Sequence, residues 1–289
     1  MVALSRVDAP RFLRRLVRKR ALSRFCSRWW RASRPRDRGS AWCTWCLERT
    51  SRTIVAMFSR SADVYDLLYS FKDYAAEAAA VDGVIRSKAP QASTLLDVAC
   101  GTGAHLAHFR ARGYRVEGLD LDPALLAVAR DRLPRVRLHT GDMRDFDLGR
   151  RFDAVTCLFS SIGYVRSVRG LLRAVATMAS HLTPGGVLIV EPWFTSDRFT
   201  ARHFSLLVAE TPELKVARAS FTGKRHRRST VAFEYLMASA EGLERFREQH
   251  VLGLFSHDEM LDAFRRAKLE VEHDPEGPAG RGLYVGSRG

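Results

Sequence analysis

The segment Thr94–Gly103, which reads TLLDVACGTG, constrains the fold of this chain more than any other. Its apolar first half, which includes Leu95 and Leu96, is typical of a strand in the core of a sheet. Gly101 and Gly103 then let the backbone turn sharply and approach a ligand, because glycine carries no Cβ. A helix is expected from about residue 104. The segment therefore predicts the first strand, turn and helix of an open α/β sheet, in which ligands bind beyond the carboxyl ends of the strands.

Two common nucleotide-binding loops do not match this turn. The dinucleotide fingerprint needs a third glycine where Leu106 stands, which counts against NAD and FAD. A P-loop is excluded because no Gly-x-x-x-x-Gly-Lys-Ser/Thr pattern occurs in the chain. The pattern that remains, Asp97-x-Ala99-x-Gly101-x-Gly103, resembles motif I of the class I S-adenosyl-L-methionine-dependent methyltransferases.

Two further carboxylates follow the next two predicted strands. Asp120 ends the run Tyr114–Asp120 and lies 19 positions after Gly101, close to the spacing at which an acid meets ribose hydroxyls. An ionised carboxylate accepts both hydrogens of such a diol. Asp142 follows a third short strand. Taken singly, each acid could be a solvated loop carboxylate, but Asp97, Asp120 and Asp142 at three consecutive strand ends favour a class I methyltransferase.

The distribution of charge limits the partners that this chain can have. Its 289 residues, 46% of them hydrophobic, suffice for one large domain. The net charge is +15, but residues 1–56 alone carry 15 basic and three acidic side chains, a net charge of +12. We therefore expect a basic leader at 1–56 and a nearly neutral methyltransferase domain at 57–289 that binds neither nucleic acid nor membrane. Cys100 and Cys157 fall in predicted core strands or turns, as expected in a reducing cytoplasm.

The basic leader at 1–56 can be interpreted in several ways. It lacks an apolar run long enough for a membrane span or a secretory signal. Only Cys26 could join the Cys-x-x-Cys pair at 43–46, and the leader has no histidine, so we expect no metal site. Residues 11–38 are compatible with a nucleic-acid arm, a membrane-surface helix or a disordered segment. We favour a gene start placed too early, with the natural start at Met57.

From residue 57 on, strands and helices alternate, which predicts a doubly wound, mostly parallel, Rossmann-like sheet of seven strands. Two helix starts are strongly marked: Asp122 precedes a proline, and Ser256 with Glu259 forms a capping box. The expected elements are a helix at 65–88, strands near 94–99, 115–120, 136–139, 153–158 and 186–191 with a helix in each of the four intervals, and a closing strand pair at 277–285.

The region 205–255 breaks this alternation. Its β-type segments at 214–221, 230–238 and 246–255 follow one another without helices, and such segments usually pair antiparallel. We predict a small inserted antiparallel sheet above the carboxyl ends of the main strands. We favour the interpretation that this sheet is a lid over the substrate, because insertions at the carboxyl ends of the main strands border the site. The alternatives are that the sheet forms a dimer contact or has no role. The sequence leaves open whether the chain forms a homodimer.

Longer motifs narrow the resemblance to one family. The motifs are similar to those of the N,N-dimethyltransferases that act on nucleotide-linked amino sugars in macrolide antibiotic pathways. The resemblance spans about residues 57–289 and implies S-adenosyl-L-methionine as cofactor and the 3-amino group of a dTDP-deoxysugar as acceptor, as in desosamine or mycaminose biosynthesis. The segments that carry it are 93–106, GDMRDF at 141–146, RFDAVTCLFSSIG at 151–163, VEPW at 190–193 and GPAGRGLY at 277–284.

Residue roles follow from this resemblance by position. Tyr65 would lie along the methionine moiety of the cofactor, Asp120 would hold the ribose, and Asp142 would accept the adenine amino group with the Met143 amide facing a ring nitrogen. The full implied set of cofactor-binding residues is Tyr65, Asp97, Ala99, Gly101, Gly103, Asp120, Asp142, Met143 and Phe159.

The resemblance also implies residues on the acceptor side. Arg281 would bind the substrate diphosphate, since a guanidinium bonds phosphate oxygens in pairs. Glu191 and Trp193 would border the sugar, and Glu191 could hydrogen-bond its amine. A close family member carries histidine where this chain has Tyr164. A phenol, with an ordinary pKa of about 10, is a poor base, so Tyr164 is expected to position the amine.

Three other functions compete with this one. The first is methylation of another small-molecule amine or natural-product scaffold. The second, a nucleic-acid methyltransferase, is suggested only by the basic leader, and the chain lacks the Asn/Asp-Pro-Pro-Tyr/Phe motif that stacks an exocyclic base amine. The third is a cofactor-binding module without catalysis.

Overall fold

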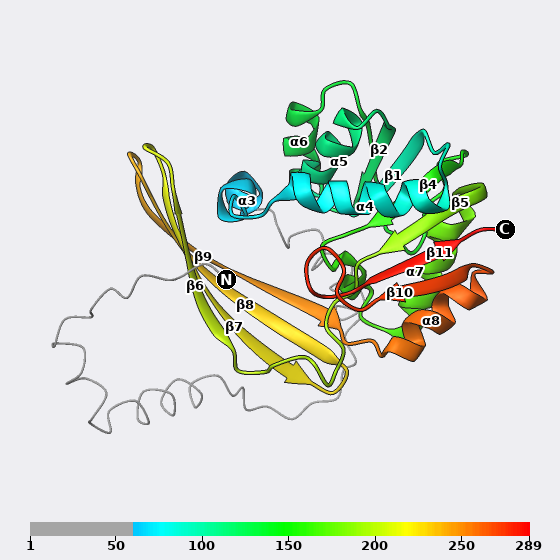
Figure 1. Ribbon diagram of the computed structural model, residues 1–289. Helices are drawn as coiled ribbons and strands as arrows, with labels where there is room; N and C mark the ends of the chain where they lie inside the picture. The colour runs from blue at the N-terminus through cyan, green and yellow to red at the C-terminus, as the bar shows by residue number, and fades with distance from the viewer. Residues whose placement is uncertain (1–59) are drawn as a thin grey trace, which may run out of the picture. The chain divides into compact units, whose positions relative to one another are not determined.

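The computed structural model describes residues 60–289, and two sheets organise this part of the chain (Figure 1). All of it belongs to one compact unit, residues 47–289. The predicted leader at 1–56 and the predicted start at Met57 lie outside the described residues. No helix between residues 60 and 289 combines the length and the apolar character that a membrane crossing requires.

The larger sheet has seven strands in the order β10-β11-β5-β4-β1-β2-β3. Strands β1 to β5 are parallel, whereas β11 runs antiparallel to β5 and β10 antiparallel to β11. This arrangement confirms the predicted mostly parallel, Rossmann-like fold. The strands are β1 (Thr94–Val98), β2 (Arg115–Asp120), β3 (Arg137–Thr140), β4 (Phe152–Cys157), β5 (Leu182–Val190), β10 (Glu270–Asp274) and β11 (Leu283–Ser287).

Helices cover both faces of this sheet, as Figure 1 shows. Helices α4 (Tyr74–Lys88), α5 (Ala104–Ala111) and α6 (Pro123–Arg132) share one core with Leu95, and α7 (Val168–Ser180) and α8 (His257–Arg266) share the other with Leu96. Both leucines are fully buried. Adjacent residues of a strand point to opposite faces, so a continuously apolar strand is what a doubly covered sheet requires. The predicted caps at Asp122 and Ser256 are confirmed, including the capping box.

The helix predicted at 65–88 is instead two helices, α3 (Ala62–Leu68) and α4. The side chain of Asp73 accepts the N–H of Ala76 at 2.8 Å and thereby starts α4 anew. Because of this break, α3 leaves the main sheet and packs against the second sheet (Figure 1). The break therefore positions Tyr65 away from α4.

Two other expectations were wrong. No helix forms between β3 and β4, because the carboxylates of Asp142 and Asp147 bond the N–H groups of Arg144 and Gly149 two residues on, which favours turns. The segment 277–285 is not a strand pair: its first half is the loop between β10 and β11.

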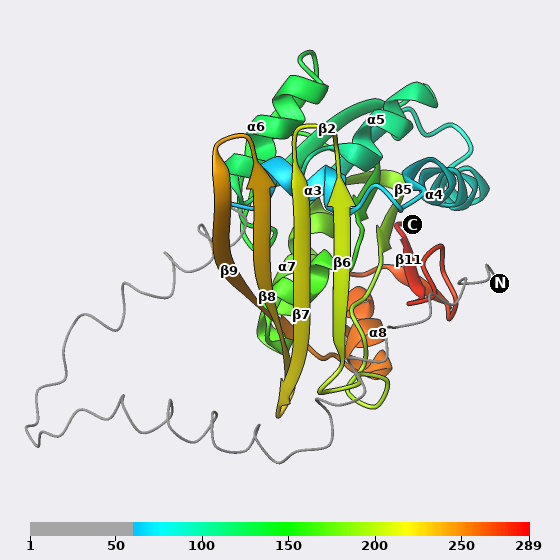
Figure 2. The same ribbon diagram turned by 90° about the vertical axis from the view of Figure 1, so that its left-hand side faces the viewer.

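The second sheet is antiparallel, with four strands in the order β6-β7-β8-β9 (Figure 2). The strands are β6 (Phe204–Glu210), β7 (Lys215–Arg225), β8 (Arg228–Ser239) and β9 (Gly242–Gly253). The sequence predicted the last three and missed β6, whose side chains are mostly exposed. One face of the sheet packs Val216, Tyr235 and Phe246 against Val64 and Leu68 of α3.

Candidate active site

A cavity of about 230 Å³ opens at the carboxyl ends of β1, β2 and β4. Helix α3 and the inner face of the antiparallel sheet complete its wall. Three residues of the sequence-predicted set, Asp97, Gly103 and Glu191, are not part of the lining. The predicted residues that line it are Tyr65, Ala99, Gly101, Asp120, Asp142, Met143, Phe159, Tyr164, Trp193 and Arg281.

Asp120 ties the glycine turn to the end of β2. One carboxylate oxygen accepts the N–H of Gly101 at 2.7 Å, and the other accepts the N–H of Asp122 at 2.8 Å. Burial raises the pKa of Asp120 to about 6, against the lowering effect of these two N–H donors. The backbone N–H of Leu121 also bonds to this carboxylate. Because a carboxylate offers about four lone-pair sites, one remains to accept a hydroxyl group from a ligand in the cavity.

The backbone at two strand ends is held in strained conformations. Ala99, directly after β1, has φ 61°, and Phe159 and Ser160, after β4, have φ 52° and 61°. The left-handed region is costly for residues other than glycine and persists only where surrounding bonds enforce it. Here the Phe159 N–H donates to Glu191 at 2.7 Å, and the Ser160 hydroxyl donates to the carbonyl of Pro192 at 2.8 Å. The cavity wall is therefore built before any ligand arrives.

Asp142 lines the cavity but is already paired. Both of its oxygens accept hydrogen bonds from the Arg144 guanidinium, and one also accepts the Arg144 N–H at 2.9 Å. Burial works to raise the pKa of Asp142, but the bonds and charge of Arg144 prevail and lower it. The carboxylate is therefore an ionised acceptor that a ligand would have to share with Arg144.

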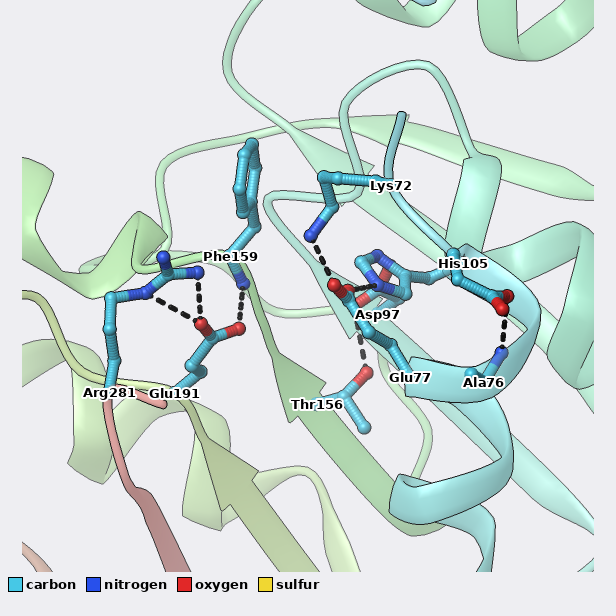
Figure 3. A network of polar contacts seen from close by, with 10 residues as sticks. Lys72, Ala76, Glu77, Asp97, His105, Thr156, Phe159, Glu191 and Arg281 are labelled. Atoms are coloured by element: carbon cyan, nitrogen blue, oxygen red, sulfur yellow. Dashed lines mark hydrogen bonds and ion pairs between the residues drawn. The ribbon is translucent and has the colours of Figure 1, made fainter. Parts of the chain in front are cut away.

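Asp97 and Gly103 lie behind the wall. Asp97 is 2% exposed and accepts the hydroxyl of Thr156 at 2.8 Å (Figure 3). Burial raises the pKa of Asp97 to about 6. Gly103 starts α5 at φ 73°, where an added Cβ would lie 3.1 Å from Leu133. Both residues therefore support the glycine turn from the side that faces away from the cavity.

Glu191 follows β5 and joins two parts of the wall (Figure 3). One oxygen accepts the Phe159 N–H at 2.7 Å, and the other accepts Nε of Arg281 at 2.9 Å and a second guanidinium nitrogen. Glu191 is 2% exposed. The predicted contact of Glu191 with the substrate amine stays a prediction: in this structure the carboxylate holds Phe159 and Arg281 and does not line the cavity.

The antiparallel sheet supplies residues that the sequence analysis missed. Arg218 of β7, Phe233 and Tyr235 of β8, and His250 of β9 line the cavity. The alternation of apolar residues along β8 was visible, but the sequence does not say which of the two faces turns inward. Tyr164 faces this wall: its hydroxyl lies 2.7 Å from Nδ1 of His250.

Arg218 is a cation without a paired acid. It donates to the Tyr69 hydroxyl at 3.0 Å, and its guanidinium lies 4.5 Å from the ring centre of Phe233. In the part of the chain that the structure describes, no carboxylate lies within ion-pair distance of it. Its Nε is buried without a hydrogen-bond partner. A buried guanidinium of this kind suits an anionic group of a ligand.

No group of three or more His, Cys, Asp or Glu side chains among residues 60–289 is placed to hold a metal ion. The site instead combines a glycine turn, a carboxylate at the end of β2 and a seven-stranded sheet with two antiparallel strands at one edge. This combination is the fold and nucleoside crevice of class I methyltransferases.

Comparison with known proteins agrees with this assignment to the methyltransferases. The methyltransferase domain family matches residues 95–186. The chain is 45% identical over 228 residues to the dTDP-3-amino-3,4,6-trideoxy-alpha-D-glucopyranose N,N-dimethyltransferase of Streptomyces venezuelae, covering 78% of this chain and 96% of that relative. It is 43% identical to the dTDP-4-amino-2,3,4,6-tetradeoxy-D-glucose N,N-dimethyltransferase of Saccharopolyspora spinosa, covering 78% and 92%.

A solved structure points the same way. The amino pentose methyltransferase CalS10 of Micromonospora echinaspora, involved in calicheamicin biosynthesis, was determined with S-adenosylmethionine bound. Its TM-score is 0.70 at 38% identity, over 88% of this chain and all of that one. The chain belongs to the S-adenosyl-L-methionine-dependent methyltransferases, in the family that contains the dTDP-aminosugar N,N-dimethyltransferases. It is therefore an enzyme that takes its methyl group from S-adenosyl-L-methionine and gives it to a small molecule.

Proposed function

We propose that this enzyme methylates the amino group of a dTDP-linked amino-deoxysugar, twice in succession, in the biosynthesis of an antibiotic. The observation that carries the proposal is identity above 40% to two dTDP-aminosugar N,N-dimethyltransferases over nearly the whole length of each. One relative is named for a 3-amino sugar and the other for a 4-amino sugar, so the proposal covers the amino-deoxysugar class. Two free, buried cysteines support a cytoplasmic setting.

The cavity residues suit the cofactor by their chemistry. Asp120 keeps acceptor capacity for a ribose hydroxyl, and Asp142 with the Met143 amide borders a space for adenine. Tyr65, Ala99, Gly101 and Phe159 form the rest of the proposed cofactor wall. When bound, S-adenosyl-L-methionine supplies a methyl group on a sulfonium that is already strongly activated.

What the chain must add is orientation and a dry environment. A well-aligned arrangement of reacting groups is worth roughly 7–11 kcal/mol. The apolar and aromatic wall made by Phe233, Tyr235 and Trp193 disfavours an ammonium ion and so favours the neutral amine with its free lone pair. Burial raises the pKa of Tyr164, so this residue stays protonated and orients the amine by hydrogen bonding.

Two arginines are proposed to hold the diphosphate. Arg281 uses two of the five N–H donors of a guanidinium on Glu191, which leaves three for phosphate oxygens, and Arg218 faces the same cavity. A second cavity of about 370 Å³ shares Trp193 and Arg281 with the first and is also lined by Arg198. The nucleotide end of the substrate is proposed to extend there. Strands β6–β9, whose inner face lines the first cavity, are proposed as a lid over the sugar.

The outer face of the lid is proposed to carry a homodimer contact. Phe204, Leu206 and Val208 alternate along the edge strand β6 and are 77%, 69% and 61% exposed, and Phe221 on β7 lies opposite Phe204. Among the described residues β6 pairs only with β7. An apolar edge strand of this kind is self-complementary across a twofold axis.

Transfer of labelled methyl from S-adenosyl-L-methionine to a panel of dTDP-aminosugars, free amino sugars and amino acids tests the proposed substrate. Dimethylated dTDP-sugars are expected as products. Arg281→Lys keeps a cation beside Glu191 but loses paired bonding, so KM for the nucleotide sugar is expected to rise about tenfold or more. Arg110→Lys, at an exposed site on α5, is the control. Equal turnover of free amines and nucleotide sugars would move the function to another small-molecule amine.

A further inference from the structure

Strand β9 brings two ionisable side chains to the Tyr164 end of the cavity. Glu248 and His250 are separated by one residue, so both point to the inner face of the sheet. His250 Nδ1 lies 2.7 Å from the Tyr164 hydroxyl, and His250 Nε2 lies 3.8 Å from Oε2 of Glu248. Tyr164, His250 and Glu248 therefore form a series of contacts that leads from the cavity into the antiparallel sheet.

Glu248 has no evident structural use. It is 8% exposed, and among the described residues neither carboxylate oxygen has a hydrogen-bond partner. A buried carboxylate is costly unless a cation or donors compensate it. The nearest group that can become a cation is the imidazole of His250, which is itself 3% exposed.

Other side chains among residues 60–289 also lie near His250 and Glu248. Phe233 of β8 packs edge-on against the imidazole, with ring centres 5.1 Å apart. Tyr235 of β8 interacts electrostatically with Glu248 and Arg218 of β7. Tyr164 is the ionisable group that contacts the imidazole from the main-sheet side. Tyr164 and His250 both line the cavity, so this hydrogen-bonded pair can meet a substrate there.

We propose that Glu248, His250 and Tyr164 form a proton relay that takes up the proton released when the acceptor amine is methylated. The inference rests on the proposed function. Tyr164 touches the amine as the catalytic residue, and Glu248 is a positioning residue that selects the imidazole tautomer.

After transfer, the nitrogen of the acceptor is a methylated ammonium ion. Its N–H bond breaks as an O–H bond forms on Tyr164, while the original O–H bond of Tyr164 breaks and an N–H bond forms on Nδ1 of His250. The imidazolium beside Glu248 is a charge-compensated pair. The amine becomes neutral, which the second methyl transfer requires, and the imidazolium loses its proton to solvent when product leaves.

The pH dependence of kcat tests the relay, because a purely structural histidine would not change it. In His250→Gln the side chain still bonds Tyr164 but cannot take up a proton. We expect kcat at pH 7 to fall about 100-fold, one limb of the pH profile of kcat to disappear, and the monomethyl product to accumulate. Glu248→Gln should shift that limb, and added imidazole should partly restore His250→Gly.

The control is His203→Gln, an exposed histidine elsewhere on the lid, which should behave as wild type. A folded His250→Gln enzyme with wild-type kcat, pH profile and product ratio would overturn the relay. If the wild-type enzyme methylates no aminosugar, the proposed function fails and not the relay geometry.

Nitrogen NMR of the imidazoles in the full-length protein, without cofactor or substrate, tests that geometry independently of activity. The relay requires a neutral His250 with the proton on Nε2 and Nδ1 accepting from Tyr164. Tyr164→Phe should then change the Nδ1 resonance, and Glu248→Gln the tautomer ratio. A proton resident on Nδ1 in the wild-type protein would refute the relay.

Discussion

The two walls of the cavity differ in how their polar groups are held. On the parallel-sheet wall, Asp120 and Asp142 are bound by backbone N–H groups or by Arg144 within a few residues of the strand ends. On the antiparallel wall, Nε of the half-buried Arg218 and both carboxylate oxygens of the buried Glu248 lack hydrogen-bond partners in the described chain.

The difference indicates two kinds of task. A wall whose acids are already fixed is suited to a ligand that never changes, because little must reorganise on binding. A wall with uncompensated charge is completed by its ligand, which makes it selective for acceptors that bring the matching groups. We associate the first wall with the cofactor and the second with the acceptor.

We expect the largest effect from a substitution of Asp120 in the parallel-sheet wall. Asp120→Ala removes the acceptor of the Gly101 N–H and the proposed acceptor of the ribose diol. We expect the dissociation constant for S-adenosyl-L-homocysteine to rise about 100-fold or more, roughly 3 kcal/mol. Isothermal titration calorimetry measures it, with Asp131→Ala at an exposed position of α6 as the control. Binding within threefold of wild type would remove Asp120 from the cofactor site.

A smaller effect on ligand affinity is expected when a change of pH protonates Asp120 in the same wall. Since burial raises the pKa of Asp120 to about 6, the carboxyl becomes protonated below that pH and loses the charge that a diol prefers. Affinity for S-adenosyl-L-homocysteine should therefore fall about tenfold between pH 7 and pH 5, and binding near pH 6 should release protons. Titrations in buffers of different ionisation heat measure both quantities.

Asp97 also has its pKa raised to about 6, but it does not line the cavity. Asp97→Asn serves as the control and should retain the pH dependence. An affinity that stays constant over this range in the wild-type protein would contradict the role given to Asp120.

The smallest effect on catalysis is expected at the outer face of the lid. Leu206→Glu places a charge in the exposed apolar row of β6 and should convert the proposed dimer to a monomer, with kcat within about twofold of wild type. Light scattering after size-exclusion chromatography measures the mass. Leu243→Glu, at a 77% exposed site on β9, should leave the mass unchanged. A wild-type protein that is already monomeric would end the dimer proposal.

The parallel wall could be predicted from sequence because its signals are local. The apolar strand, the acid and the glycine turn occur within residues 94–103, and Asp120 follows at a spacing fixed by one helix and one strand. Asp142, which follows the third predicted strand, and Phe159, which the family resemblance implied, also line the cavity. Their individual roles rest on the family resemblance.

The acceptor wall could not be predicted because its contacts join distant segments. His250 lies 86 positions from Tyr164, and Arg281 lies 90 positions from Glu191. No pattern in the sequence indicates such a pairing. The strand β6 was missed since Phe204, Leu206 and Val208 face outward, which reverses the usual relation between hydrophobicity and burial.

The antiparallel sheet is one uninterrupted stretch of chain, from β6 to β9. A single recombination event could thus replace the whole acceptor-recognising surface and leave the methyl-donor machinery intact. Helix α3 sets the condition for such an exchange, because its Val64 and Leu68 share a hydrophobic core with the sheet. Evolution of new sugar preferences in this enzyme would have to alter the two segments together.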